Sequence, residues 1–165
     1  MSGRHDMFIV SRQLQTRAEV IAELSAYAGL FVSAFAAATL LPAQSEAVLA
    51  ALLLAQAYPA WPLIAIASVG NVLGSVVNWL IGRGVERFRD RRWFPADSRA
   101  MDRAQAWYRR YGKWSLLASW VPIVGDPITL AAGMLREPLP SFLLLVTIAK
   151  TGRYIALAAI VLNWT

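Results

Sequence analysis

The stretch LIAIASVGNVLGSVVNWLI, from Leu63 to Ile81, decides the fold of this chain. It contains no charged residue, and its most polar side chains are two serines and two asparagines. A helix rises about 1.5 Å per residue, so about twenty apolar residues cross the hydrocarbon core of a bilayer. The stretch therefore predicts a transmembrane helix, and the turn YPAWP at 58–62 supplies aromatic side chains for the membrane interface before it.

A second long apolar stretch, Ser141–Trp164, predicts another crossing, although it carries Lys150 and Arg153. Hydrophobic residues make up 58% of the 165 residues and charged residues 16%, and the mean hydropathy is +0.48. Average soluble chains carry roughly 25% charged residues. The composition therefore predicts a single membrane domain over 24–165, preceded by an interfacial segment at 1–23.

The basic residues are concentrated between the apolar stretches. Ten of the sixteen Lys and Arg lie between Arg83 and Lys113, where there are only four acids. The positive-inside rule predicts that this segment is cytoplasmic and that both termini lie on the opposite face. The net charge of +6 therefore indicates membrane topology and no nucleic-acid partner. Within the segment, Ser98–Tyr111 predicts an amphipathic helix at the headgroups, with one face formed by Met101, Ala104 and Tyr108.

Two shorter apolar regions each surround a turn with a proline and an acid. In the first region, arms at 24–41 and 47–57 flank the sequence LLPAQSE. In the second, arms at 114–121 and 128–135 flank PIVGDP at 122–127. Most of these arms are too short to cross a bilayer, which takes about twenty residues. Each region therefore predicts a re-entrant hairpin that returns to the face it entered.

The two halves of the chain repeat this order. A shift of 80 residues places Pro42 on Pro122 and Glu46 on Asp126. A turn and a long crossing follow each hairpin, so the second half enters from the opposite face. The predicted fold is an all-α polytopic membrane protein with two re-entrant hairpins and two long transmembrane helices. Its halves, 24–82 and 114–164, form an inverted repeat of the kind found in many secondary transporters.

Four charged residues within the apolar regions are the strongest candidates for function. Glu46 and Asp126 are predicted to respond to protons or ions, because an acid in lipid usually faces a partner or a water-filled cavity. The alternative is that both are helix caps in headgroup water. Lys150 and Arg153 share one helix face near mid-depth, so they need counterions. We expect a cluster of two acids and two bases that binds an anion such as lipid phosphate; snorkelling or a structural ion-pair network is the alternative.

A further set of positions has small, amide or turn-forming side chains. Small residues permit close helix contact, and asparagines can hydrogen-bond across helices or line a polar path. The predicted motif and packing positions are Pro42, Gly70, Asn71, Gly74, Asn78, Gly82, Pro122, Gly125, Pro127 and Gly133.

The sequence offers little for catalysis. It has no cysteine, and its one histidine, His5, stands near a terminus. No nucleotide-binding loop, zinc motif or serine-hydrolase elbow is present. We therefore expect no catalytic residue, no metal and no cofactor. A membrane hydrolase that uses the acid pair ranks last, because it lacks a nucleophile and a metal set.

Two motifs link the chain to a known family. Gly70, Gly74 and Gly82 fit G-x-x-x-G-x-x-x-x-Y-x-x-G, with Trp79 in place of the tyrosine. In LLASWVPIVGDPITLAAG, residues Pro122, Ala132 and Gly133 fit a second motif, F-x-x-R-x-x-P-x-x-R followed by Ala-Gly. Ser119 and Gly125 stand where that motif has arginines. Over 24–160 the chain resembles the DedA superfamily, also called the VTT or SNARE-associated family, and its S-W-x-P-x-x-G-D-P form resembles the YqaA-like branch.

The resemblance implies two re-entrant hairpins that face each other and a role in moving lipids or in membrane homeostasis. Several relatives are implicated in recycling undecaprenyl phosphate with an ion gradient, and eukaryotic relatives in lipid scrambling. The two missing arginines set this chain apart from that pattern. We expect Arg153 to replace one of the lost cations in space.

We therefore expect a multi-pass protein of the bacterial inner membrane, and not an enzyme. It would translocate a lipid or a small anionic solute, coupled to protons through Glu46 and Asp126, with Lys150 and Arg153 as anion or counterion partners. Its expected partners are membrane lipids and a lipid phosphate or small anion, and a homo-oligomer remains open. The alternative is a non-transporting membrane scaffold, in which the charges only fix helix packing.

Overall fold

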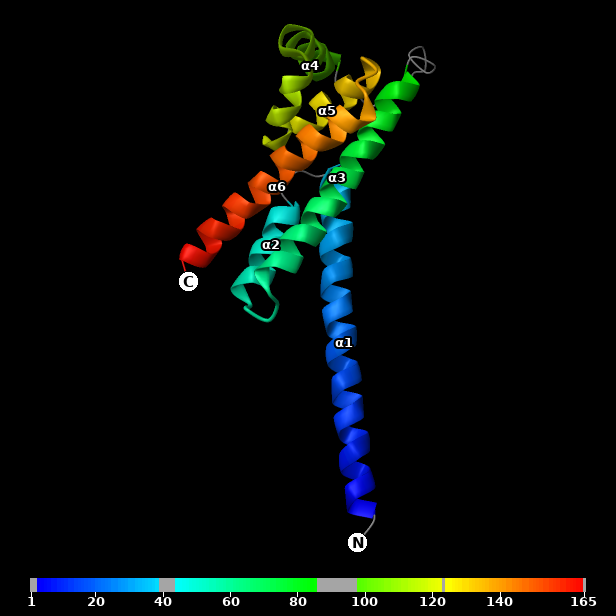
Figure 1. Ribbon diagram of the computed structural model, residues 1–165, viewed down its shortest axis with the longest axis vertical. Coiled ribbons are helices and arrows are strands. Elements are labelled where there is room, and N and C mark those ends of the chain that lie inside the picture. Colours follow the sequence, from blue (N-terminus) through cyan, green and yellow to red (C-terminus); the bar gives the residue numbers. More distant parts are fainter. Residues whose placement is uncertain (1–2, 39–43, 86–97, 123, 165) are drawn as a thin grey trace.

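The computed structural model describes residues 3–38, 44–85, 98–122 and 124–164, and their regular structure is helical throughout (Figure 1). The all-α class is therefore confirmed. In chain order the elements are α1 (Gly3–Ala37), α2 (Gln44–Leu54), α3 (Ala60–Val85), α4 (Ser98–Tyr111), the 3₁₀ helix η1 (Gly112–Trp120), α5 (Gly125–Met134) and α6 (Leu139–Asn163).

Three helical stretches are long and apolar enough to cross a membrane: Gln15–Ala37, Ala60–Gly84 and Leu139–Asn163. The last two are the predicted crossings. The first is a third candidate span, beyond the two that were predicted. It arises because α1 continues without a break through residue 23, where we expected an interfacial segment to end. No proline lies between Gly3 and Ala37 to interrupt it. The N-terminal part of α1 projects beyond the other helices (Figure 1).

Two pairs of elements, α1–α2 and η1–α5, meet α3 at different parts (Figure 1). α1 and α2 pack against its first half and middle, and α5 packs against its second half, whereas η1 packs against α5 and α6. Glycines permit both contacts. A Cβ at Gly70 would lie 2.7 Å from the carbonyl oxygen of Phe31 in α1, and one at Gly82 would meet the carbonyl oxygen of Leu130 in α5. α3 therefore joins the two pairs through close backbone contact.

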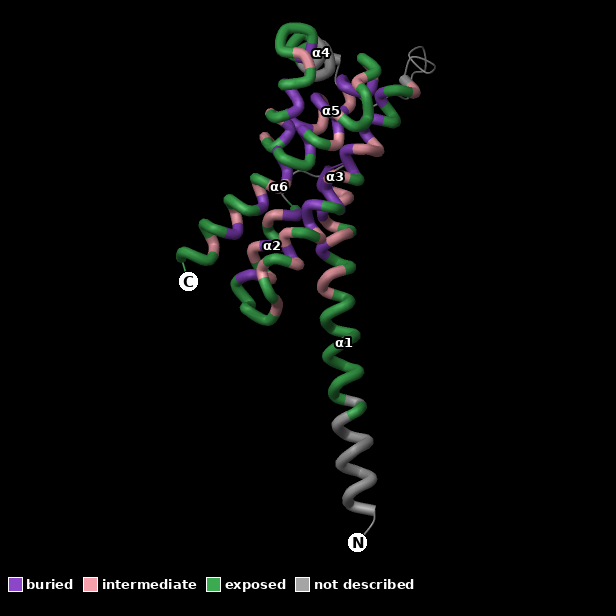
Figure 2. The backbone as a smooth tube through the Cα atoms, in the orientation of Figure 1, coloured by how far each residue is buried: buried purple, intermediate pink, exposed green. Residues whose placement is uncertain are grey.

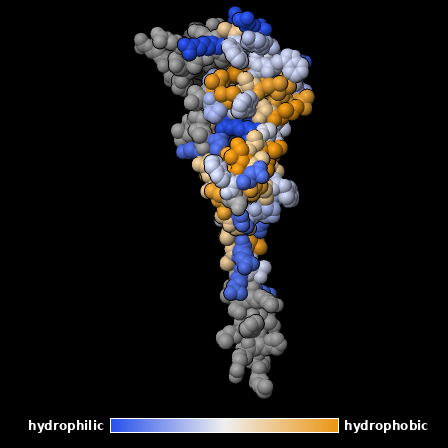
Figure 3. All heavy atoms as spheres, turned by 90° about the vertical axis from the view of Figure 1, so that its left-hand side faces the viewer, coloured by the Kyte–Doolittle hydropathy of each residue, from blue (hydrophilic) through white to orange (hydrophobic). Residues whose placement is uncertain are grey.

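Buried residues gather where the helices meet, whereas the middle of α1 is exposed (Figure 2). Their apolar side chains form two hydrophobic clusters. One contains Trp79 and Val146, and the other contains Ala67 and Tyr154. Between them in sequence, α3 carries buried Asn71, Ser75 and Asn78, and α6 carries buried Lys150. A polar layer therefore separates two apolar cores. Seen from the α6 side, hydrophilic atoms also lie at mid-height among hydrophobic ones (Figure 3).

The predicted amphipathic helix at Ser98–Tyr111 is confirmed as α4. Tyr108 is buried, and its hydroxyl donates a hydrogen bond of 2.5 Å to Glu137 Oε2 in the turn before α6. The side chains of Met101 and Ala104 lie outside the described part. α4 lies at the end of the molecule away from both termini (Figure 1).

Candidate functional site

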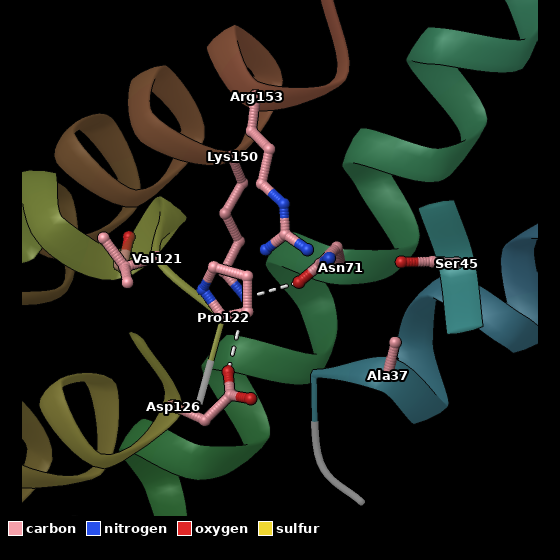
Figure 4. A pocket seen from close by; sticks show the side chains of 9 residues that line it. Ala37, Ser45, Asn71, Val121, Pro122, Asp126, Lys150 and Arg153 are labelled. Carbon is pink, nitrogen blue, oxygen red and sulfur yellow. Dashed lines mark hydrogen bonds and ion pairs between the residues drawn. The ribbon is translucent and has the colours of Figure 1, made fainter. Parts of the chain in front are cut away.

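The two cations of α6 meet the first turns of two short helices. Glu46 lies in the first turn of α2, and Asp126 lies in the first turn of α5. Arg153 forms an ion pair with Glu46. Lys150 Nζ lies 3.5 Å from Asp126 Oδ1, as Figure 4 shows. The structure thus brings together the four charged residues singled out in the sequence.

Lys150 is 3% exposed, so its charge depends on partners inside the protein. Its Nζ donates a hydrogen bond to Asn71 Oδ1 on α3. Asn71 Nδ2 donates to the Tyr154 hydroxyl at 2.6 Å, and that hydroxyl donates to Ser45 Oγ at 2.8 Å. A chain of contacts therefore runs from the start of α5, through α6 and α3, to the start of α2.

Glu46 depends on Arg153 in the same way. Both of its carboxylate oxygens are buried, and Arg153 is the charged partner that they meet. Arg153 also donates from Nη1 to the carbonyl oxygen of Trp120, at 3.0 Å. Removing one partner of a buried ion pair costs about 3–5 kcal/mol, because the other charge stays desolvated. The pair therefore links α6 to both α2 and η1.

The helix ends favour acids at these two positions. Backbone N–H groups point out of the first turn of a helix, where the helix dipole stabilises negative charge. Pro127 in the first turn of α5 fits as well, because a proline there removes no helical hydrogen bond. The Thr129 hydroxyl donates to the Asp126 carbonyl oxygen at 2.8 Å, which fixes the turn.

A small cavity lies between these groups (Figure 4). Its volume is about 10 Å³, and its lining includes Asp126, Lys150, Arg153 and Pro122. This is about the space that one water molecule needs. The two acids balance the two bases, so the cluster is formally neutral, and Asp126, Lys150 and Arg153 line a water-sized space.

The other predicted positions lie mainly in helix contacts. Gly70 and Gly74 face α1, Gly82 faces α5, and a Cβ at Gly133 would meet the Trp79 carbonyl oxygen. Asn78 Nδ2 donates to the Ala38 carbonyl oxygen at 2.6 Å.

Gly125 packs where η1 turns into α5, because a Cβ there would meet the Ser119 carbonyl oxygen. Among the predicted motif and packing positions, Pro42 lies outside the described part of the chain.

Two members of the network were missed in the sequence. Tyr154 lies one turn after Lys150, and Ser45 directly precedes Glu46. Their spacing from the charged residues is a signal that could have identified them. Ser119 is buried and also lines the cavity. Arg153 reaches the carbonyl of the next residue, Trp120, so it lies near a position where the family motif has an arginine.

The comparisons with known proteins agree on one family. The VTT domain matches residues 41–162. The inner membrane protein YqaA of Escherichia coli (strain K12) is 39% identical over 130 residues, which is 79% of this chain and 87% of the relative. An uncharacterized protein of Haemophilus influenzae is 37% identical over 135 residues, which is 78% of this chain and 82% of the relative.

A more distant relative, from Staphylococcus aureus, is named undecaprenyl phosphate transporter A. It is 28% identical over 97 residues, which is 54% of this chain and 48% of the relative. No solved structure matches. With its VTT domain, its close similarity to an inner membrane protein and its three candidate spans, this chain belongs to the DedA/VTT family as a YqaA-like, multi-pass protein of the bacterial inner membrane.

Proposed function

We propose that this protein is a transporter that moves a lipid phosphate or a small anionic solute across the inner membrane and is driven by protonation of Glu46 and Asp126. The observation that carries the proposal is the cluster itself. Two cations on one long helix are held by acids on two short helices, one from each half of the chain. Charges in a membrane segment are costly, and they commonly mark the path of a substrate or a proton.

Proton uptake would open the cluster to an anion. With both acids ionised the cluster is neutral, so an added anion would create an uncompensated charge away from water. Protonation of Glu46 leaves Arg153 without its charged partner, and a guanidinium binds phosphate oxygens in a bidentate manner. Protonation of Asp126 acts on Lys150 in the same way. Anion binding and proton binding are therefore coupled.

The proposed mechanism includes two re-entrant hairpins, α1–α2 and η1–α5, which enter from opposite faces as an inverted repeat. Supporting this, α2 has 11 residues and α5 has 10, which is too few to cross a bilayer. Both helices begin at the charged cluster, and α1 and α5 pack on different parts of α3. Movement of one half against the other would expose the cluster to each face in turn. The relative named undecaprenyl phosphate transporter A supports a lipid phosphate as the substrate.

Transport in proteoliposomes tests the proposal. A fluorescent lipid phosphate and radiolabelled inorganic phosphate serve as the two substrates, with and without an imposed pH gradient. We expect wild-type protein to move one of them, at a rate that depends on the gradient. Glu46→Gln and Asp126→Asn should abolish this dependence, whereas Glu19→Gln, at an exposed acid of α1, should retain it. Folded wild-type protein that moves neither substrate would contradict the proposal.

A non-transporting membrane scaffold is the second candidate, and the small central cavity favours it. A space of about 10 Å³ holds no phosphate, and the paired charges satisfy one another. A scaffold moves no substrate, so neutral substitutions at the acids would lower its stability and no gradient-dependent flux would be seen in wild type or variants. The same variants therefore distinguish the two functions.

A further inference from the structure

A much larger cavity lies on the outer side of α6. Its volume is about 440 Å³, and α6 contributes Ala149, Gly152, Ala156 and Ile160 to its wall. Trp120 of η1 and the Glu46–Arg153 ion pair also line the cavity. From residue 149 to residue 160 a helix rises about 16 Å, so the cavity is an elongated groove along α6. We call it the α6 groove.

The small residues of the α6 groove leave space that the protein does not fill. A Cβ at Gly152 would meet no atom within 4 Å, whereas Gly70 and Gly82 are in close contact with neighbouring helices. Trp120 is 53% exposed and Ile160 is 59% exposed, so the groove opens outward between apolar side chains. Because α6 is long and apolar enough to cross the membrane, we expect hydrocarbon around the groove.

The polar part of the groove selects the kind of ligand. Arg153 uses Nη2 for Glu46 and Nη1 for the Trp120 carbonyl, but a guanidinium has five N–H donors. It is 16% exposed, and once protonation neutralises Glu46, its remaining N–H groups can donate to an anionic oxygen of a ligand. A second helix could fill the apolar part of the groove, but a helix does not in general carry an anion for Arg153. A lipid supplies both the chain and the anion.

We propose that the α6 groove binds one hydrocarbon chain of an anionic lipid, whose phosphate lies at Arg153. The ligand would then reach the charged cluster sideways from the bilayer, between α2, η1 and α6, and not from water. A cavity of this volume falls within the range of small-ligand pockets, roughly 300–1,000 Å³. The inference rests on the proposed function for the role of Arg153 as the anion-binding group, but binding in the groove requires no transport.

Photolabelling in nanodiscs tests the groove directly. The probe is phosphatidic acid with a diazirine in its acyl chain, and labelled peptides are mapped by mass spectrometry. We expect labelling between residues 149 and 160. Gly152→Leu should reduce it roughly tenfold or more by filling the groove. Gly29→Leu is the matched control, because a Cβ at Gly29 also meets nothing within 4 Å. Ala156→Leu provides a second filling variant if Gly152→Leu does not fold.

Further experiments distinguish the lipid from other possible ligands of the groove. Excess inorganic phosphate should leave the labelling unchanged, whereas Arg153→Gln should weaken it for phosphatidic acid more than for a diazirine phosphatidylcholine. Equal labelling of wild-type protein and both filling variants would overturn the proposal. So would an interchain disulfide formed by Gly152→Cys in this cysteine-free chain, because the groove would then lie between two copies. Labelling without transport would retain the groove and reject the proposed function.

Discussion

Lys150 and Arg153 lie one turn apart on α6, but different groups stabilise their charges. Lys150 is almost fully buried and shares its charge between the Asn71 amide oxygen and the more distant carboxylate of Asp126. Arg153 contacts a carboxylate and a backbone carbonyl. Asn71 is therefore as important to Lys150 as its acid is, although it carries no charge.

Asn71→Leu should be among the most destabilising single changes in the polar layer. It removes the acceptor for Lys150 and the donor for Tyr154 while keeping the branching of the side chain at Cγ. A buried polar group that loses its partner costs about 1–3 kcal/mol, and a charged group costs more. Thermal unfolding in detergent should show a clear fall in Tm. Tyr154→Phe, which removes only one hydroxyl, should cost less; equal Tm values for Asn71→Leu and wild type would contradict the network.

The sequence identified the charged residues of the site but not their connections. An acid or base in an apolar stretch is visible as a costly exception, and it signals that a partner exists. It does not show which acid meets which base, because the pairing depends on how helices far apart in sequence pack. Asn71 was predicted only as a packing or path residue, and Tyr154 and Ser45 were not singled out at all.

The glycines of α3 bring this helix against both halves of the molecule. Gly82→Ala should be strongly destabilising, because its Cβ would overlap the Leu130 carbonyl oxygen of α5. Gly84→Ala is the matched control: it lies two residues away, and its Cβ would meet nothing within 4 Å. Helix propensity alone makes Gly84→Ala neutral or stabilising by up to about 1 kcal/mol. Thermal melts of the two variants measure the difference, and similar losses in both would argue against the close α3–α5 contact.

α4 is held on the membrane domain by a titratable contact. Burial, and then the hydrogen bond to Glu137, raise the pKa of the Tyr108 hydroxyl far above its usual value. Because the folded-state pKa exceeds the unfolded value of about 10, the contribution to stability is complete below that pH and is lost as the pH rises above it.

We therefore expect α4 to stay docked at neutral pH and to loosen in strongly alkaline solution. Hydrogen exchange of residues 98–111 at a series of pH values, corrected for intrinsic rates, measures this. Tyr108→Phe keeps the ring but loses the bond to Glu137, so its exchange should be faster at neutral pH and depend less on pH above about 10. Identical protection in the variant would show that the hydroxyl does not hold α4.

Element types were more predictable than element lengths. The periodicity of Ser98–Tyr111 predicted α4, and the uncharged run from Leu63 predicted α3. The full length of α1 was not predicted, because the charged residues up to residue 23, among them Arg17, Glu19 and Glu23, were assigned to a separate interfacial segment. In the structure all three side chains are exposed, so they do not oppose a continuous helix. Charges limit where a helix lies in the membrane, but they do not stop it, as a proline would.

The whole molecule combines two apolar cores, a polar layer between them and a basic end. The number of complete crossings follows from the faces on which the termini lie. If α1 and α2 form a re-entrant hairpin, only α3 and α6 cross, and both termini share the face opposite α4. If α1 crosses as well, three crossings place the termini on opposite faces. The length and composition of α1 permit either arrangement.

Cysteine labelling decides between these topologies in a chain that has no cysteine of its own. Suitable exposed sites are Gln13 in α1, Arg103 in α4 and Trp164 after α6. Each is changed singly to cysteine, and intact cells are treated with a membrane-impermeant maleimide. Because basic segments stay in the cytoplasm, Arg103→Cys should react only after lysis, whereas Gln13→Cys and Trp164→Cys should both react from outside. If Gln13→Cys is protected and Trp164→Cys reacts, α1 crosses completely, and the inverted repeat on which the proposed mechanism depends is ruled out.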